Sequence, residues 1–130
     1  MTRNIAWLIG MTLLVSAGSA AAATEPPFFG GWARGDGKAR IRIEPCGAAA
    51  CAINTWIRPG TPHEKTGDRL ILNVDPVRPA EWTGEAFDPQ RNLTYTVRIS
   101  VADRRMTTKG CIIAGLLCKR MAWTRIGPSN

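Results

Sequence analysis

The chain has 130 residues and a formal net charge of +7, and 45% of its residues are hydrophobic. This length suits one domain and excludes two with separate cores, while the hydrophobic fraction excludes an intrinsically disordered chain. An excess of Lys and Arg favours anionic partners, but the charges are scattered, which indicates a solvated basic surface rather than a dedicated anion site.

The first segment has the pattern of a secretory signal peptide. Arg3 gives it a positive start, Ile5–Ala17 is almost entirely apolar, and the segment ends in the alanines Ala20–Ala23. The apolar run is shorter than the roughly 20 residues of a spanning helix, which disfavours an uncleaved anchor. We predict a signal-peptide helix within residues 1–23, then one periplasmic or secreted domain over residues 24–130. Export argues against a nucleic-acid partner, and cleavage leaves no segment suited to stable membrane insertion.

Beyond the leader, apolar and polar residues alternate with a period of two, which predicts strands with one buried and one exposed face. The alternation is clearest over Tyr95–Val101, and turn residues such as Gly35-Asp36-Gly37 and Asp88–Asn92 separate the runs. Asp75-Pro76 and Arg78-Pro79 are expected to break the fourth run. The predicted strands are residues 28–34, 38–45, 51–57, 69–74, 80–87, 93–101, 105–112 and 118–126.

Short connections make consecutive strands pair as antiparallel hairpins, and such a sheet has exposed edges unless it closes. We therefore expect an all-β fold, a small up-and-down antiparallel β-barrel of about eight strands, with an open sandwich as the alternative. A barrel of this size encloses packed side chains or one small ligand. The apolar stretch Gly110–Leu117 is too short to span a bilayer and is interpreted as the tip of the last hairpin.

The cysteines are even in number, and all lie in the domain predicted to be exported, which favours two disulfides. They are Cys46, Cys51, Cys111 and Cys118. Four cysteines allow three pairings, and the sequence alone does not decide among them. Local geometry favours Cys46–Cys51 and Cys111–Cys118, because each pair brackets a short hairpin turn with its cysteines facing each other at the neck. The spacings match neither a C-x-x-C redox motif nor a zinc site.

Few residues offer catalytic chemistry. His63 is the only histidine and lies in a Pro- and Gly-rich loop, where it cannot form the usual Ser–His or Cys–His arrangement. The acidic residues are dispersed, and Glu81 and Glu85 stand about 13 Å apart along a strand, too far for glycoside hydrolysis. We predict no enzymatic activity, no cofactor and no metal.

Several short motifs occur in an order and spacing that resemble one bacterial family. The motifs are Gly30-Gly31-Trp32, Cys46-Gly47, Cys51, Trp82-Thr83-Gly84, Asp88-Pro89, Thr94-Tyr95, Gly110-Cys111 and Trp123-Thr124-Arg125. Together they are similar to the domain of unknown function 2147, whose members look like small exported proteins with a lipocalin-like, calycin-type barrel. The sequence departs from the family pattern at Ala52, where the family usually has glycine, and at Pro89–Asn92, where it usually has a turn that contains glycine. It implies a fold and a compartment but no reaction.

The resemblance also implies a packing arrangement at one end of the barrel. In lipocalin-like barrels a tryptophan of the first strand closes the end, and an arginine of the last strand lies across its face. Carried over to this sequence, Gly30, Trp32 and Arg125 would seal the barrel by such a stack. An ordinary core position is the alternative for Trp32.

On this basis we expect a binding module for a small hydrophobic or amphipathic ligand. The aromatic residues that could line its site are Trp56, Trp82, Phe87, Tyr95 and Trp123. If they only fill the core, the protein is instead a structural or protein-interaction component of the cell envelope. A cavity above roughly 300 Å³ favours binding, and a tightly filled interior favours the structural role. The sequence leaves the oligomeric state open.

Overall fold

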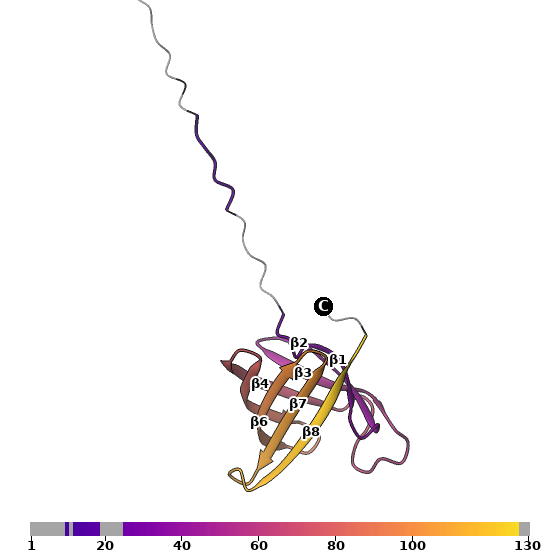
Figure 1. Cartoon of the computed structure of the whole chain (residues 1–130). Helices are drawn as coiled ribbons and strands as arrows, with labels where there is room; N and C mark the ends of the chain where they lie inside the picture. The colour runs from indigo at the N-terminus through magenta and orange to yellow at the C-terminus, as the bar shows by residue number, and fades with distance from the viewer. Residues whose placement is uncertain (1–9, 11, 19–24, 128–130) are drawn as a thin grey trace, which may run out of the picture.

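A computed structural model of the protein describes residues 10, 12–18 and 25–127. In this part of the chain, the strands form a closed antiparallel barrel whose order around the sheet follows the chain (Figure 1). Closure occurs where the last strand pairs with the first, which confirms the up-and-down barrel over the open sandwich. The strands are β1 (Gly30–Arg34), β2 (Ala39–Cys46), β3 (Ala49–Ile57), β4 (Arg69–Arg78), β5 (Glu81–Asp88), β6 (Leu93–Ala102), β7 (Arg105–Ile112) and β8 (Leu117–Ile126).

The signal-peptide helix predicted within residues 1–23 falls largely outside the described residues. Residues 12–18, which are described, have neither helical nor strand structure. Across the described chain, no helix has the length and apolar character needed to cross a membrane.

The fourth strand is longer than the sequence predicts. A break is expected at Asp75-Pro76, but β4 continues to Arg78. Only its first half, from Arg69 to Leu72, pairs with β3, so beyond Leu72 its single sheet neighbour is β5. A proline lacks the N–H that a central strand needs, and Pro76 is tolerated because this half of β4 is an edge. The pairing shifts between Pro76 and Arg78, as at a β-bulge.

The barrel has two different ends, which follow from the alternating strand directions. The connections β1–β2, β3–β4, β5–β6 and β7–β8 lie at one end, here named the mouth end. The connections β2–β3, β4–β5 and β6–β7 lie at the other, the closed end, together with the segment before β1. That segment turns through a hydrogen bond from Phe29 N–H to Pro26 O, and Phe28 packs edge-on against Trp82 with ring centroids 4.9 Å apart.

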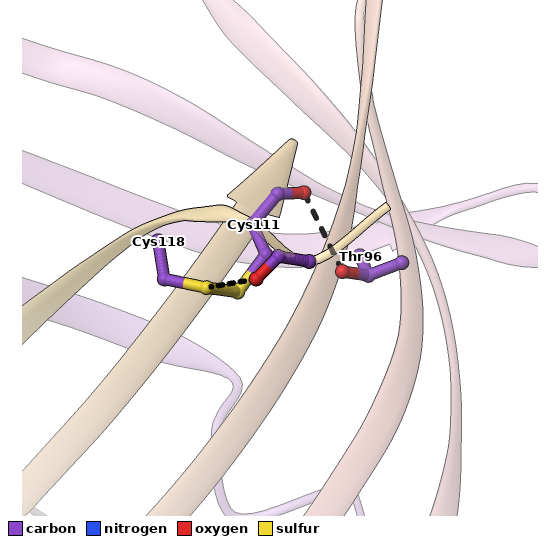
Figure 2. Close-up of a disulfide and its surroundings, with 4 residues drawn as sticks. Thr96, Cys111 and Cys118 are labelled. Atoms are coloured by element: carbon purple, nitrogen blue, oxygen red, sulfur yellow. Dashed lines mark hydrogen bonds between the residues drawn. A yellow bond between two sulfur atoms is a disulfide. The ribbon is translucent and has the colours of Figure 1, made fainter. Parts of the chain in front are cut away.

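Both favoured disulfides are present, Cys46–Cys51 and Cys111–Cys118, and no described cysteine is free. Cys111 and Cys118 are direct cross-strand partners at the neck of the β7–β8 hairpin, as expected (Figure 2). The expected register is wrong for the other pair. The β2–β3 turn contains only Gly47-Ala48, so Cys46 faces Ala49, and Cys51 lies diagonally across the hairpin. Two disulfides are compatible with an oxidising, exported environment.

Candidate functional site

The barrel encloses a cavity of about 500 Å³. Its lining includes Pro62 and His63 of the β3–β4 loop and Gln90 of the β5–β6 turn, which places its opening at the mouth end. Each strand directs alternate side chains inward, and at the floor these inward positions carry hydrophobic residues. The floor residues are Ile41, Ile43, Ala52, Leu72, Ala86, Ile99 and Met106.

The local sequence explains both the apolar wall and the space inside it. In β2, Ile41 and Ile43 are buried while the alternating Arg40 and Arg42 are exposed, which is the period-two pattern of the sequence. Small residues at inward positions leave volume unfilled. A Cβ atom built on Gly110, which lines the cavity from β7, would meet no other atom within 4 Å.

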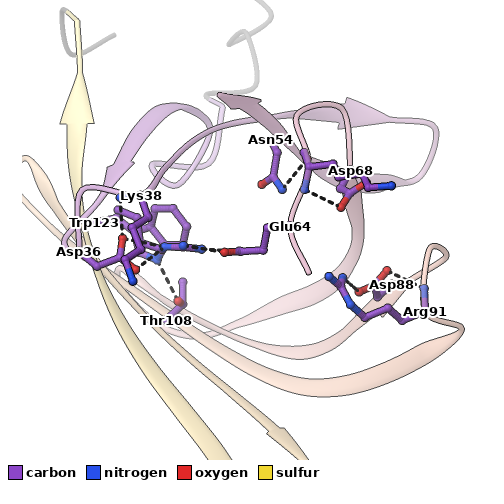
Figure 3. Close-up of polar contacts among 11 residues, drawn as sticks. Asp36, Lys38, Asn54, Glu64, Asp68, Asp88, Arg91, Thr108 and Trp123 are labelled. Atoms are coloured by element: carbon purple, nitrogen blue, oxygen red, sulfur yellow. Dashed lines mark hydrogen bonds and ion pairs between the residues drawn. The ribbon is translucent and has the colours of Figure 1, made fainter. Parts of the chain in front are cut away.

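A partly buried ion pair stands on one side of the mouth. Arg34, at the end of β1, donates from Nη1 to Glu64 Oε1 at 2.5 Å and from Nη2 to Glu64 Oε2 at 2.8 Å (Figure 3). Its Nε also donates to Asp36 at 3.0 Å. These hydrogen bonds lower the pKa of Glu64 below its usual value and raise the pKa of Arg34. The pair therefore ties the β3–β4 loop to the barrel wall.

Asp88 is the buried charged residue of the described chain and stands on the other side of the mouth (Figure 3). Its carboxylate accepts hydrogen bonds from Gln90 N–H at 2.9 Å and from Arg91 Nη1 at 2.7 Å. Desolvation alone would raise the pKa of Asp88, but the hydrogen bonds from Arg91 and Gln90 outweigh it, and the pKa is lowered. The sequence identifies Asp88 only as a turn residue. An aspartate that opens a turn and bonds to its backbone is the signal for this role.

Three charged residues that line the opening, Arg69, Lys119 and Asp68, form no ion pair with another described residue. Lys119 nevertheless interacts electrostatically with Glu64. Tyr95 contributes an aromatic side chain to the same lining. The site thus combines an apolar interior with a charged rim in which basic residues slightly outnumber acidic ones.

The structure separates the five aromatic residues predicted to line a ligand site. Tyr95 and Trp123 line the cavity, and Trp123 Nε1 donates to Thr108 Oγ1 at 3.0 Å. Trp82 instead packs on Phe28 at the closed end.

The other two predicted lining residues lie outside the barrel wall. Trp56 is 38% exposed, and the guanidinium carbon of Arg40 lies 5.4 Å from its ring centroid. Phe87 lies between the inward-facing Ala86 and Asp88 and therefore faces outward.

At the closed end, Trp32 is fully buried and its Nε1 donates to Phe28 O at 2.9 Å. The guanidinium carbon of Arg125 lies 4.2 Å from the Trp32 ring centroid. Arg125 also donates from Nη1 to Phe29 O at 2.9 Å and from Nη2 to Pro27 O. Gly30 has a φ of 105°, and a Cβ there would lie 3.0 Å from Arg125 Nη1. Arg125 therefore lies over the Trp32 ring and approaches the backbone of Gly30.

In the part of the chain that the structure describes, no group of His, Cys, Asp and Glu side chains is arranged to hold a metal ion. His63 is exposed on the β3–β4 loop. The described cysteines are all in disulfides and offer no thiolate nucleophile. Nothing in this geometry indicates a catalytic centre.

Comparison with known proteins gives one match. A family model described as an uncharacterized protein conserved in bacteria (DUF2147) matches residues 30–125. This range covers nearly the whole barrel, with both disulfides and the cavity. No curated protein and no solved structure matches the chain.

Proposed function

The chain belongs to the DUF2147 family, and we propose that it is an exported, periplasmic binding module for a small amphipathic ligand. The observation that carries this proposal is the cavity of about 500 Å³. Ligand pockets begin at roughly 300 Å³ and combine a mostly apolar lining with a few placed polar groups. The apolar floor and polar rim of this barrel fit that description.

The charges at the mouth indicate the polarity of the ligand. Glu64 and Asp88 are paired with arginines, whereas Arg69, Lys119 and Asp68 have no ion-pair partner among the described residues, which leaves a small excess of positive charge at the opening. A ligand whose apolar body occupies the floor would place its head group beside these cations. An anionic head group, such as a carboxylate or phosphate, is favoured there.

Two further features support the exported, lipocalin-like assignment. The disulfides suit an oxidising compartment. The contact between Trp32 and Arg125 closes one end only, which leaves a cup open at the mouth. The alternative role, an envelope component with a filled interior, accounts less well for a cavity of this size.

The proposal is tested by titrating the oxidised protein with a fluorescent carboxylate amphiphile, dansyl-aminoundecanoic acid. We expect saturable binding of one probe per barrel, with blue-shifted emission as the dansyl group leaves water. Gly110→Phe should weaken binding by roughly tenfold or more, because the ring enters open cavity space. Gly110→Ala is the matched control, since it changes the same position without filling the cavity.

The anionic head group is tested separately, by comparing a charged probe with a neutral one. Arg69→Gln should weaken binding of the carboxylate probe but not of its neutral alcohol analogue, because only the carboxylate interacts with the positive charge of Arg69. Native mass spectrometry of the protein purified from its own envelope would reveal a co-purifying molecule. Failure of the probe to bind, or equal binding by Gly110→Phe and Gly110→Ala, would contradict a cavity ligand.

A further inference from the structure

The tip of the β7–β8 hairpin gathers exposed apolar side chains beside the mouth. Ile113, Leu116 and Leu117 are 62%, 79% and 56% exposed. In the described barrel domain, the other large exposed hydrophobic residues, Trp56, Val77 and Ile126, are isolated from one another along the sequence. Figure 1 shows this hairpin protruding from the end of the barrel opposite the C-terminus.

The backbone of this turn is unfavourable for the residues that occupy it. Ile113 and Ala114 have φ values of 54° and 51°, in the left-handed region that β-branched residues strongly avoid. The loop has four residues, and its third one, Gly115, also has a positive φ of 82°, which glycine adopts at no steric cost. Ile113 is mostly exposed, so core packing does not offset this cost. The backbone thus holds an apolar side chain outward at an unfavourable position, which points to a contact outside the barrel.

The charged side chains of the β7–β8 hairpin behind the tip, Lys109, Lys119 and Arg120, are all basic. Glu64 of the β3–β4 loop interacts electrostatically with Lys119. Lys109 and Arg120 are cross-strand partners, and Lys119 and Arg120 are exposed. At about 3.3 Å per strand residue, Lys119 and Arg120 stand about 10 Å behind the turn. Interfacial segments insert their apolar side about 5–10 Å into the head-group region, so these cations would lie at the level of the lipid phosphates.

We propose that the β7–β8 hairpin docks the protein peripherally onto an anionic lipid bilayer. Ile113, Leu116 and Leu117 enter the interface, and Lys109 and Arg120 behind them contact phosphate groups. The Cys111–Cys118 disulfide joins the two strands at the neck of the hairpin, so the hairpin loses less conformational entropy when it binds. Because the tip belongs to the mouth end, the cavity then opens toward the membrane. Docking does not depend on the proposed ligand. A second copy of this chain is disfavoured as the partner, because paired hairpins would bring like charges together.

The proposal is tested by flotation of the exported, oxidised protein with phosphatidylcholine vesicles that contain or lack phosphatidylglycerol. We expect binding to the anionic vesicles, weakened by salt, and little to the neutral ones. Arg120→Gln should lower the partition coefficient about fivefold, and Leu116→Ser with Leu117→Ser by more than about tenfold. Arg105→Gln and Val77→Asn, exposed positions at the closed end, are the matched controls and should bind as the wild type does.

Ile113→Asn separates docking from folding. Asparagine tolerates a positive φ better than isoleucine, so this variant should melt at a higher temperature and yet bind vesicles more weakly. Equal binding to neutral and anionic vesicles would overturn the proposal, as would hairpin variants that bind like the wild type. A dimer that Leu116→Ser dissociates, seen by sedimentation without vesicle binding, would assign the tip to a second copy instead.

Discussion

Arg125 and Trp32 are direct cross-strand partners on β8 and β1, and the guanidinium carbon lies 4.2 Å from the indole centroid. These strands are furthest apart in the chain, and their pairing closes the barrel. One contact therefore both covers the closed end and joins first strand to last. This position also carries a desolvation penalty for Arg125. Burial lowers the pKa of Arg125, and its Nε is buried without a hydrogen-bond partner among the described residues.

Arg125→Ala should lower the melting temperature of the oxidised protein. It removes the cation–π contact and the hydrogen bonds to Phe29 O and Pro27 O, worth about 1–2 kcal/mol together after the desolvation cost is subtracted. A loss of this size lowers the melting temperature of a domain near 100 residues by roughly 5–10 °C. Circular dichroism measures it, with the exposed Arg105→Ala as control. An unchanged melting curve would count against the packing.

Gly30→Ala should destabilise the barrel, because residue 30 has a φ of 105° and the new methyl group would lie 3.0 Å from Arg125 Nη1. The combined backbone and steric cost is about 1–3 kcal/mol. Gly110→Ala, on a strand with ordinary φ and open space around the new atom, should leave stability unchanged or higher. Urea denaturation compares the two, and equal midpoints would exclude the close approach at Gly30.

Asp88→Asn should remove part of the acid sensitivity of folding. Because the folded-state pKa of Asp88 is lowered, its carboxylate stabilises the protein above the ordinary value of about 3.9, and this contribution is lost as pH falls through the lower folded pKa. At neutral pH the free energy of unfolding of the variant should be lower than that of the wild type by about 1–3 kcal/mol. Below about pH 4 it should decrease less than that of the wild type does. Denaturant midpoints at both pH values measure this effect. Asp103→Asn, at an exposed turn, is the control, and the same pH profile in both variants would refute the assignment.

Removing the two disulfides should have unequal effects. Each closes a short loop, worth roughly 2 kcal/mol in the chain-entropy model. Cys51 is buried, whereas Cys118 is exposed, so Cys46→Ser with Cys51→Ser loses packing as well. That double variant should therefore unfold at lower urea than Cys111→Ser with Cys118→Ser. The reverse order would show that the β7–β8 hairpin depends more strongly on its clamp.

Period-two alternation predicted the strands well where both neighbours are present. The seventh strand has the expected bounds, and the other strands except β4 differ by one or two residues at an end. The largest error is at Pro76, where a residue that breaks central strands lies on an edge. Edge positions depend on how far the neighbouring strand extends, and this is a property of the sheet rather than of the local sequence.

The candidate site was harder to predict. Aromatic character indicated five lining residues, but the register places Trp56 and Phe87 outside the barrel and Trp82 at the closed end. The neutralised pair of Arg34 and Glu64 was not foreseen, because its members are 30 residues apart. A one-residue change in register exchanges the two faces of a strand, so composition alone cannot select the inward set.

The sequence by itself determined the all-β class and the strand pattern and favoured the local disulfide pairing, because alternation, turn residues and short cysteine spacings act over a few neighbouring residues. Only the tertiary structure decided which side chains surround the cavity, which mouth charges are neutralised and which residue lies over Trp32. Those relationships arise when strands distant in the chain pair in one register and the barrel closes, so they depend on the whole sheet at once.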